Sequence, residues 1–169
     1  MSKEVRFITK TGFLLAIALV VQIGLAPFSQ FVVGPLVNMV LLLAVILVGP
    51  WGAVTVGCLT PIVAFSVGIM GLLPVVPLIM LGNCVYVLVF WILGRNRRLI
   101  ALIVSALAKF AVLAGGVRLL AWVFIPNLPA PVIATLSLPQ LYTALLGGVV
   151  ALLLLHYLPE KMVRAEWQR

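Results

Sequence analysis

Apolar residues occur along this chain in long blocks, and short runs of proline, glycine or basic residues separate one block from the next. A helix needs about 20 predominantly apolar residues to cross a bilayer. Six blocks approach or reach this length, over roughly residues 9–26, 35–48, 52–70, 76–94, 99–125 and 139–158. The second block is the shortest, at about 14 residues, and would need a few neighbouring residues to cross. The pattern therefore predicts an all-α membrane protein with six transmembrane helices.

The composition supports a membrane protein and leaves little chain for anything else. Of the 169 residues, 65% are hydrophobic and only 8% are charged, and the mean hydropathy is +1.35. Soluble domains have about 45–50% apolar and about 25% charged residues, so this excess is too large for one soluble core of this size. We expect a single six-helix transmembrane domain over residues 1–169, with no separate soluble domain such as an ATPase.

The basic residues predict how the helices are oriented. The predicted loops near residues 27–34, 71–75 and 126–138 carry no charged residue. Because six helices place both termini on one side, every basic cluster can face the cytoplasm, as the positive-inside rule favours, and contact anionic membrane lipid there. Five or seven helices would place one terminal cluster outside. Because the positive-inside rule accounts for the positive charge, no nucleic-acid partner is needed to explain it. The clusters are Lys3, Arg6 and Lys10; Arg95, Arg97 and Arg98; and Lys161, Arg164 and Arg169.

Few residues in the sequence could carry enzyme chemistry. The acids Glu4, Glu160 and Glu166 all lie in the predicted tails, so no carboxylate is available inside the membrane for proton-coupled antiport. The sequence contains no GxxxxGK[ST] phosphate loop, HExxH metal motif or GxSxG nucleophile elbow. Cys58 and Cys84 lie in apolar blocks, where buried thiols are common. We therefore expect a protein that is not an enzyme, with no catalytic residue, metal site or cofactor.

Two cations inside the fifth predicted helix are the strongest sign of a binding site. Lys109 falls near the middle of the bilayer and Arg118 nearer its outer side, where inserting a charge costs at least about 2.5–3.5 kcal/mol. Either Arg118 extends to the outer interface and Lys109 binds backbone carbonyls, or an anionic ligand supplies the missing counter-charge. Nine residues on a regular helix turn through about 180°, so both cations serve one site only if Gly115-Gly116 bends the helix. We take Arg118 as the main candidate.

Polar and aromatic residues gather in the predicted outer half of the membrane. Asn83 and Tyr86 share a helix face at a spacing of i+3, and Arg118 and Trp122 share one at i+4. A guanidinium with amides and aromatic rings suits a small, flat anion. The alternative is that the amides join helices and the rings form an interfacial belt. Polar residues at this depth are Gln22, Asn38, Ser66, Asn83, Gln140 and Tyr142, and the predicted substrate-binding set is Arg118, Asn83, Tyr86, Trp122, Asn38, Gln140, Tyr142 and Lys109.

The third and fourth predicted helices carry sequences that resemble a known family. GPWGAVTVGCLTPIVAF at 49–65, a proline-rich outer loop and PLIMLGN at 77–83 resemble the substrate-binding S component of energy-coupling factor (ECF) vitamin transporters, and the likeness covers essentially the whole chain. The resemblance implies an outward-facing vitamin site built from the later helices and loops. It also implies a transmembrane coupling subunit and two cytoplasmic ATPases as partners, and transport by toppling in the membrane. Its docking face would use small residues four apart on the first helix, which Gly12 and Ala16 match.

Together these features predict a multi-pass protein of the bacterial cytoplasmic membrane that captures a small, anionic vitamin or precursor from outside and delivers it inward. Carboxylated molecules such as pantothenate, nicotinate, biotin or lipoate fit this prediction better than a cation such as thiamine. Two alternatives stay open. A self-contained oligomeric channel or facilitator would need a polar path through both leaflets, and the aliphatic inner half argues against one. A membrane enzyme or assembly factor acting on a lipid-linked anion is the other.

Overall fold

The computed structural model describes residues 2–28 and 30–158, and these residues are almost entirely helical, with no strand among them. A short π-helical segment, Leu120–Phe124, continues the fifth helix without a break. The α-helices are α1 Lys3–Gly24, α2 Gln30–Leu47, α3 Pro50–Ser66, α4 Val75–Leu93, α5 Arg98–Leu119, α6 Ala130–Thr135 and α7 Leu138–Leu155.

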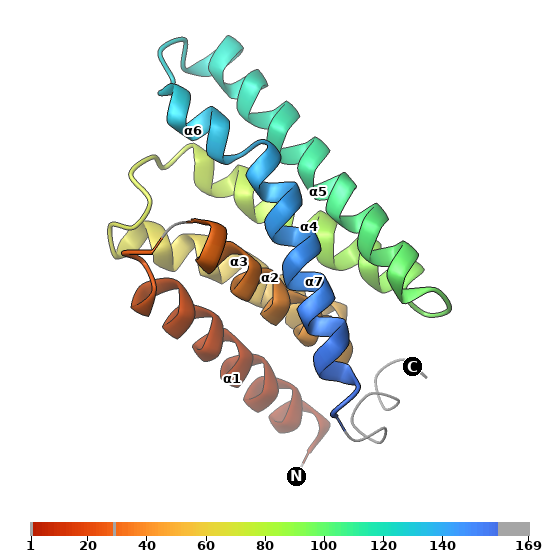
Figure 1. Cartoon of the computed structure of the whole chain (residues 1–169). Coiled ribbons are helices and arrows are strands. Elements are labelled where there is room, and N and C mark those ends of the chain that lie inside the picture. The colour runs from red at the N-terminus through yellow and green to blue at the C-terminus, as the bar shows by residue number, and fades with distance from the viewer. Residues whose placement is uncertain (1, 29, 159–169) are drawn as a thin grey trace.

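Six helices of the described chain pack on one another in a closed ring. Each packs on the next in the order α1, α3, α4, α5, α7, α2, and α2 returns to α1. The remaining helix, α6, packs on α7 and α5 at one end of the bundle (Figure 1). α1 and α5 therefore occupy opposite positions in the ring, with two helices between them in either direction.

The helix boundaries follow the sequence pattern except around the first three helices, where α1 begins at Lys3 and not near residue 9. α6 lies within the segment near residues 126–138 that the sequence predicts as a loop. α2 begins at Gln30 and not near residue 35, because the helix accommodates Pro35 in its interior. α3 ends at Ser66, and its 17 residues make it the shortest helix of the ring. Five helical segments of the described chain are long and apolar enough to span a membrane, and α3 is an apolar but shorter helix. The prediction that the second helix is the short one is thus wrong, since the short helix is the third.

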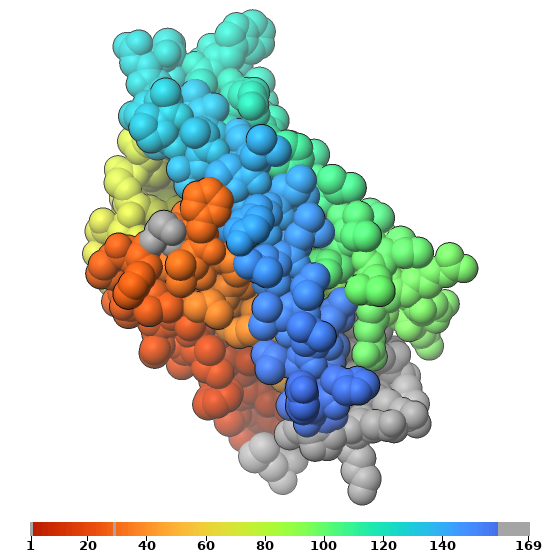
Figure 2. Space-filling model, in the orientation of Figure 1, coloured from red at the N-terminus to blue at the C-terminus, as the bar shows by residue number. Residues whose placement is uncertain are grey.

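The ring closes through a tight contact between α2 and α7, which lie side by side in the space-filling view (Figure 2). Gly147 makes this contact possible, because a Cβ at this position would collide with the backbone oxygen of Pro35. Away from the α1–α2, α3–α4 and η1–α6 connections, side chains such as Leu41, Ile46 and Phe90 fill the interior and are fully buried. Close packing of this kind leaves little free volume, so this part of the bundle is a solid apolar core.

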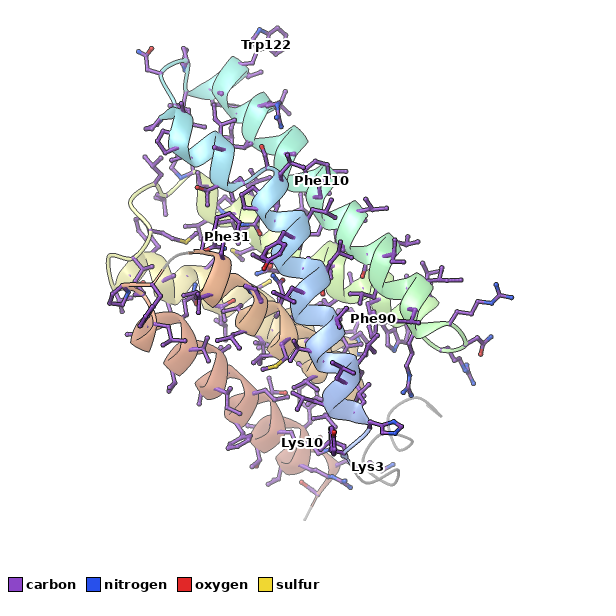
Figure 3. All side chains as sticks on the ribbon, viewed as in Figure 1. Lys3, Lys10, Phe31, Phe90, Phe110 and Trp122 are labelled. Carbon is purple, nitrogen blue, oxygen red and sulfur yellow. The ribbon has the colours of Figure 1, made fainter. Side chains whose placement is uncertain are left out.

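The two ends of the bundle differ in charge. The start of α1, the α4–α5 turn and the end of α7 lie at one end, and the α1–α2, α3–α4 and η1–α6 connections lie at the other (Figure 1). Lys3 and Lys10 are at the first end and Trp122 is at the second (Figure 3). The basic cluster at residues 95–98 occupies the α4–α5 turn and the start of α5. Two predicted clusters thus share one end, and the third, at 161–169, lies outside the described residues.

Cysteines introduced at the two ends should react from opposite sides of the membrane. In a chain with Cys58 and Cys84 replaced by alanine, we expect Asn127→Cys, in the uncharged η1–α6 connection, to react with an impermeant maleimide added to intact cells. Asn96→Cys, in the basic α4–α5 turn, should react only after the cells are opened. Labelling of Asn96→Cys in sealed cells would contradict this orientation.

Candidate functional site

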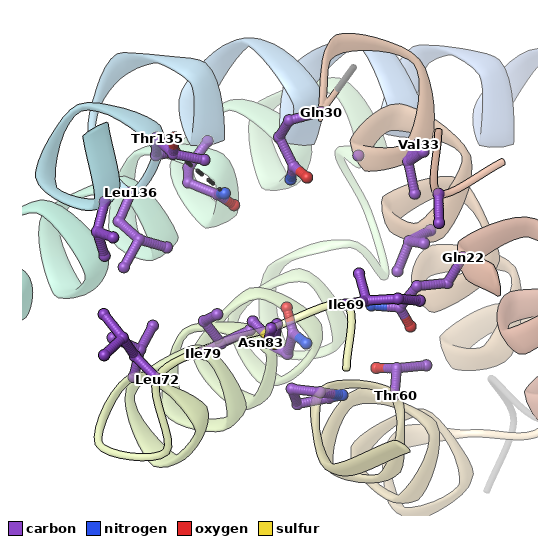
Figure 4. Close-up of a pocket in the computed structure, with 18 of the residues that line it drawn as sticks. Gln22, Gln30, Val33, Thr60, Ile69, Leu72, Ile79, Asn83, Thr135 and Leu136 are labelled. Carbon is purple, nitrogen blue, oxygen red and sulfur yellow. Dashed lines mark hydrogen bonds between the residues drawn. The ribbon is translucent and has the colours of Figure 1, made fainter. Parts of the chain in front are cut away.

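A cavity of about 440 Å³ lies inside the ring at the end with the uncharged connections. The start of α2, the α3–α4 connection and α6 meet around this end on the face shown in Figure 2. Figure 4 shows the interior, where Gln22 of α1, Thr60 of α3 and Asn83 of α4 approach from different helices. Every helix of the ring contributes at least one side chain to the wall.

The cavity wall is mostly apolar and carries a single cation. Aliphatic side chains such as Val33, Ile69 and Ile79 form much of its surface. Among the described residues no Asp, Glu, His or Cys lines the wall, and no group of three such side chains is placed to hold a metal. The charge that a bound molecule would meet is therefore an ammonium. The polar side chains of the wall are Gln22, Gln30, Asn38, Thr60, Asn83, Lys109, Thr135 and Gln140.

Lys109 is held by two amide side chains from neighbouring helices. Its Nζ donates to Asn38 Oδ1 of α2 at 2.7 Å and to Asn83 Oδ1 of α4 at 2.8 Å. Exposed fractions of 2% for Lys109, 3% for Asn38 and 4% for Asn83 show that all three are buried. The ammonium also lies 5.2 Å from the centre of the Tyr86 ring, within the range of a cation–π interaction. These four residues are called the Lys109 network below.

Backbone contacts determine which way the two amides of the network face. Asn38 Nδ2 donates to the carbonyl oxygen of Gly34 at 2.9 Å, and Asn83 Nδ2 donates to that of Gly57, also at 2.9 Å. Because the amide nitrogens are used in this way, both carbonyl oxygens point toward Lys109. Gly57 also permits the close approach of α3 and α4, since a Cβ there would lie 3.1 Å from Asn83 Cβ.

Tyr86 supports the network from behind the cavity wall. It is fully buried, and its hydroxyl donates to the carbonyl oxygen of Ala144 in α7 at 2.7 Å. The ring is not part of the cavity lining, so its contact is with Lys109 and not with a bound molecule. Tyr86 therefore links α4 to α7 next to the ammonium.

The Lys109 network leaves the cation without a negative partner. Its acceptors are neutral amides, and the sequence contains no acid between Glu4 and Glu160. An ammonium has three N–H donors, and only two acceptors among the described residues lie within hydrogen-bond distance of it. The network thus presents a desolvated positive charge with a donor to spare, which favours binding of an anion.

Arg118, the main candidate from the sequence, is placed outside the cavity. α5 is regular through Gly115-Gly116, so Arg118 lies on the opposite side of the helix from Lys109. Its side chain is exposed, and its Nη1 donates to the carbonyl oxygen of Ala114 in its own helix at 2.7 Å. Trp122, one turn further on, is 82% exposed at the far end of the bundle (Figure 3). Neither residue lines the cavity.

Of the two remaining predicted residues, Gln140 lines the cavity and Tyr142 does not. Gln140 is buried, and its Nε2 donates to the carbonyl oxygen of Thr135 at 3.3 Å, which ties α7 to α6. The Tyr142 ring is half exposed and packs edge-on against Phe31 at 5.7 Å between ring centres. The structure therefore places Lys109, Asn38, Asn83, Gln140 and Tyr86 at or directly behind the cavity, and Arg118, Trp122 and Tyr142 away from it.

Four polar residues of the wall are absent from the predicted set, namely Gln22, Gln30, Thr60 and Thr135. Thr135 falls in the predicted loop near residues 126–138, and its hydroxyl donates to the carbonyl oxygen of Pro131 at 2.7 Å. Gln22 was expected at the right depth but was given no role, and Gln30 fell in the predicted loop before α2, which begins earlier than expected. Thr60 lies in an apolar helix, and its hydroxyl donates to the carbonyl oxygen of Val56 at 3.0 Å. The signal that could have found Gln22 and Thr60 is a polar side chain in an otherwise apolar helix.

A ring of apolar helices around a buried, charged cavity defines a membrane protein that binds a small molecule within the bundle. The family described as ECF transporter, substrate-specific component, matches residues 6–159, and the chain belongs to this family. No curated protein and no solved structure matches the chain. The resemblance noted from residues 49–65 and 77–83 is thereby confirmed. The chain is a multi-pass membrane protein and a substrate-binding subunit of an ECF transporter.

Removing one acceptor from the Lys109 network should destabilise the empty protein. Asn83→Leu keeps the size of the side chain but deletes its bonds to Lys109 and Gly57. Since a hydrogen bond to a charged group contributes about 1.5–3 kcal/mol, we expect the free energy of unfolding to fall by about 2 kcal/mol. Thermal unfolding in detergent measures this, and Asn127→Leu, in the exposed η1–α6 connection, should leave the midpoint unchanged. An unaltered midpoint in Asn83→Leu would show that the network does not support the fold.

Proposed function

We propose that the cavity is the substrate site and that the substrate is a small molecule with one carboxylate, captured from outside the cell. The observation that carries this proposal is the buried Lys109 ammonium, whose partners are neutral amides. A charge inside a membrane helix costs at least about 2.5–3.5 kcal/mol, and a bound anion offsets part of that cost. Lys109 thus takes the role that the sequence suggested for Arg118.

The remaining wall narrows the chemistry of the substrate. One ammonium balances one negative charge, which suits a carboxylate better than a phosphate dianion. The apolar surface suits an organic body, and the cavity volume of about 440 Å³ is within the usual range for small-molecule sites. A wall without an acid does not favour a cation such as thiamine. Carboxylated vitamins or precursors such as pantothenate, nicotinate, biotin and lipoate have the required charge.

In this proposal the uncharged end of the bundle faces outside. The basic start of α1 and the basic α4–α5 turn mark the cytoplasmic end, because Lys and Arg are enriched on the inner side of bacterial membranes. The cavity is at the opposite end, where α6 and residues 69–72 border it. The N-terminus and the end of α7 would then both be cytoplasmic, and the protein would lie in the bacterial cytoplasmic membrane.

Delivery of the substrate requires partners in this proposal. The sequence has no phosphate-binding loop, so energy would come from two cytoplasmic ATPases through a transmembrane coupling subunit. The apolar core around Leu41, Ile46 and Phe90 offers no polar path to the cytoplasm. This solid core supports a subunit that topples as a whole and argues against a channel or facilitator.

α1 offers a face for the coupling subunit. Only 17% of the residues in its most apolar 18-residue stretch are buried inside the bundle, which is the lowest share among the candidate membrane spans. Gly12 and Ala16 are exposed on this helix, and a Cβ on Gly12 would meet open space. Small residues four apart allow another helix to approach closely in a membrane. We therefore place the docking face at Gly12 and Ala16.

Replacing Lys109 should greatly weaken the affinity for carboxylates. Lys109→Met keeps a long side chain and removes the charge, and breaking a buried charge pair from one side costs about 2–5 kcal/mol, or about 30-fold to several thousand-fold in affinity. Equilibrium binding of pantothenate, nicotinate, biotin and lipoate measures this, together with any small acid released when the purified parent is denatured.

Arg118→Met is the matched control for Lys109→Met, because it removes the other cation of α5 and that cation is exposed. It should bind these molecules as the parent does. The proposal would be wrong if Lys109→Met bound the acid as tightly as the parent, or if the released molecule proved neutral or cationic.

Enlarging the small residues of α1 should separate docking from substrate binding. We expect Gly12→Leu or Ala16→Leu to prevent co-purification with the coupling subunit and to stop uptake, while substrate affinity stays unchanged. Phe13→Leu, at a neighbouring exposed position, should preserve assembly. Loss of substrate affinity in Gly12→Leu would mean that this face packs within the subunit.

A further inference from the structure

Gln22 lines the cavity and has an amide oxygen without a hydrogen-bond partner. It lies near the end of α1 and lines the wall, and its side chain extends toward Thr60 (Figure 4). Its Oε1 is buried and has no hydrogen-bond partner among the residues that the structure describes. Buried amide oxygens normally accept a hydrogen bond, so an unpaired one in a cavity wall indicates a donor that arrives with a ligand.

Thr60 is the nearest labelled hydroxyl in Figure 4, and it does not supply this donor. Its Oγ1 donates to the carbonyl oxygen of Val56 at 3.0 Å, within its own helix. Gln22 therefore differs from the amides of the Lys109 network, whose oxygens and nitrogens all have protein partners.

Gln22 and Lys109 reach the cavity from opposite members of the ring. α1 packs on α2 and α3, whereas α5 packs on α4 and α7. A molecule that contacts both side chains must therefore extend across the cavity, with one polar group at each end. Apolar side chains such as Val33, Ile79 and Leu136 line the wall that its middle would meet.

We infer that the substrate is a bifunctional monocarboxylic acid, with its carboxylate at Lys109 and a hydroxyl or amide N–H at the other end that donates to Gln22 Oε1. The inference rests on the proposed function, because it takes the carboxylate position at Lys109 as given. A second carboxylate would find no second cation in the wall, and an amine would find no acid. A neutral donor is the group that an unpaired amide oxygen accepts without a counter-charge. Gln22 is thus a specificity-determining residue.

Matched pairs of monocarboxylic acids test this inference. The two members of a pair share one skeleton of about four to ten carbon atoms, a size that fits the cavity, and only one carries a hydroxyl or amide far from the carboxylate. All the pairs are combined and mixed with the purified protein, and native mass spectrometry identifies the acids that the protein retains. Dissociation constants are then measured for both members of each pair that contains a retained acid. We expect the parent to bind the member with the donor about tenfold more tightly.

Two variants separate the ends of the site. Gln22→Met keeps the length of the side chain and removes the amide, so the advantage of the donor should disappear while the affinity for the plain acid stays, which also shows that the variant folds. Ile23→Met, at an exposed neighbouring position of α1 that does not line the cavity, should keep the advantage.

The outcomes distinguish this inference from the proposed function. The role of Gln22 is overturned if the parent shows no preference within pairs or if Gln22→Met keeps the preference. It is also overturned if Gln22→Met loses affinity for both members of a pair alike. In each of these cases the carboxylate site at Lys109 stands. If Lys109→Met binds the acids as the parent does, the proposed function fails.

Discussion

The arrangement of this bundle depends on one hydrogen-bonded ammonium. Lys109 of α5 binds Asn38 of α2 and Asn83 of α4, and the Asn83 amide is bonded in turn to the backbone of α3. Tyr86, beneath the ammonium, is bonded to the backbone of α7. One cation therefore connects five helices of the ring. Within the described residues, α1 is the ring helix that makes no hydrogen bond to the network, and it is also the least buried of the candidate spans.

Neutral partners suit this ammonium better than an acid would. A carboxylate in the place of Asn38 or Asn83 would form an ion pair, which would satisfy the charge and compete with an anion from outside. Amide oxygens stabilise the ammonium by hydrogen bonds and leave its charge uncancelled. The surrounding apolar core keeps the local dielectric constant low, so the attraction on a carboxylate is stronger than it would be in water. A network of this kind can be stable while the cavity is empty and can still attract an anion.

The sequence predicted the helices well and the site only in part. Apolar length and the proline, glycine and basic interruptions locate all the ring helices. The pattern predicts a helix start near Pro35, however, and α2 includes this residue in its interior. The spacing of Lys109 and Arg118 correctly implied opposite faces on a regular helix. Packing against α4 and α7 decides which face of α5 turns inward. The sequence of α5 alone does not identify these two neighbours. Asn83 and Tyr86 could be paired from the sequence because their i+3 spacing is local, whereas the partnership of Asn38 with Lys109 depends on the closure of the ring.

The long sequence separations within the Lys109 network have a consequence for biosynthesis. Asn38 precedes Lys109 by 71 residues. It precedes Thr143 by 105 residues, and the Thr143 hydroxyl lies 3.4 Å from the Asn38 amide nitrogen. Because chains are made from the N-terminus, α2 enters the bilayer long before either partner is translated, and its amide then has only the carbonyl of Gly34 in its own helix. A nascent chain that stops before α5 cannot form the network, and one that stops before α7 cannot close the ring. The Lys109 network and the closed ring therefore form late in translation, and a truncated product would enter the membrane without them.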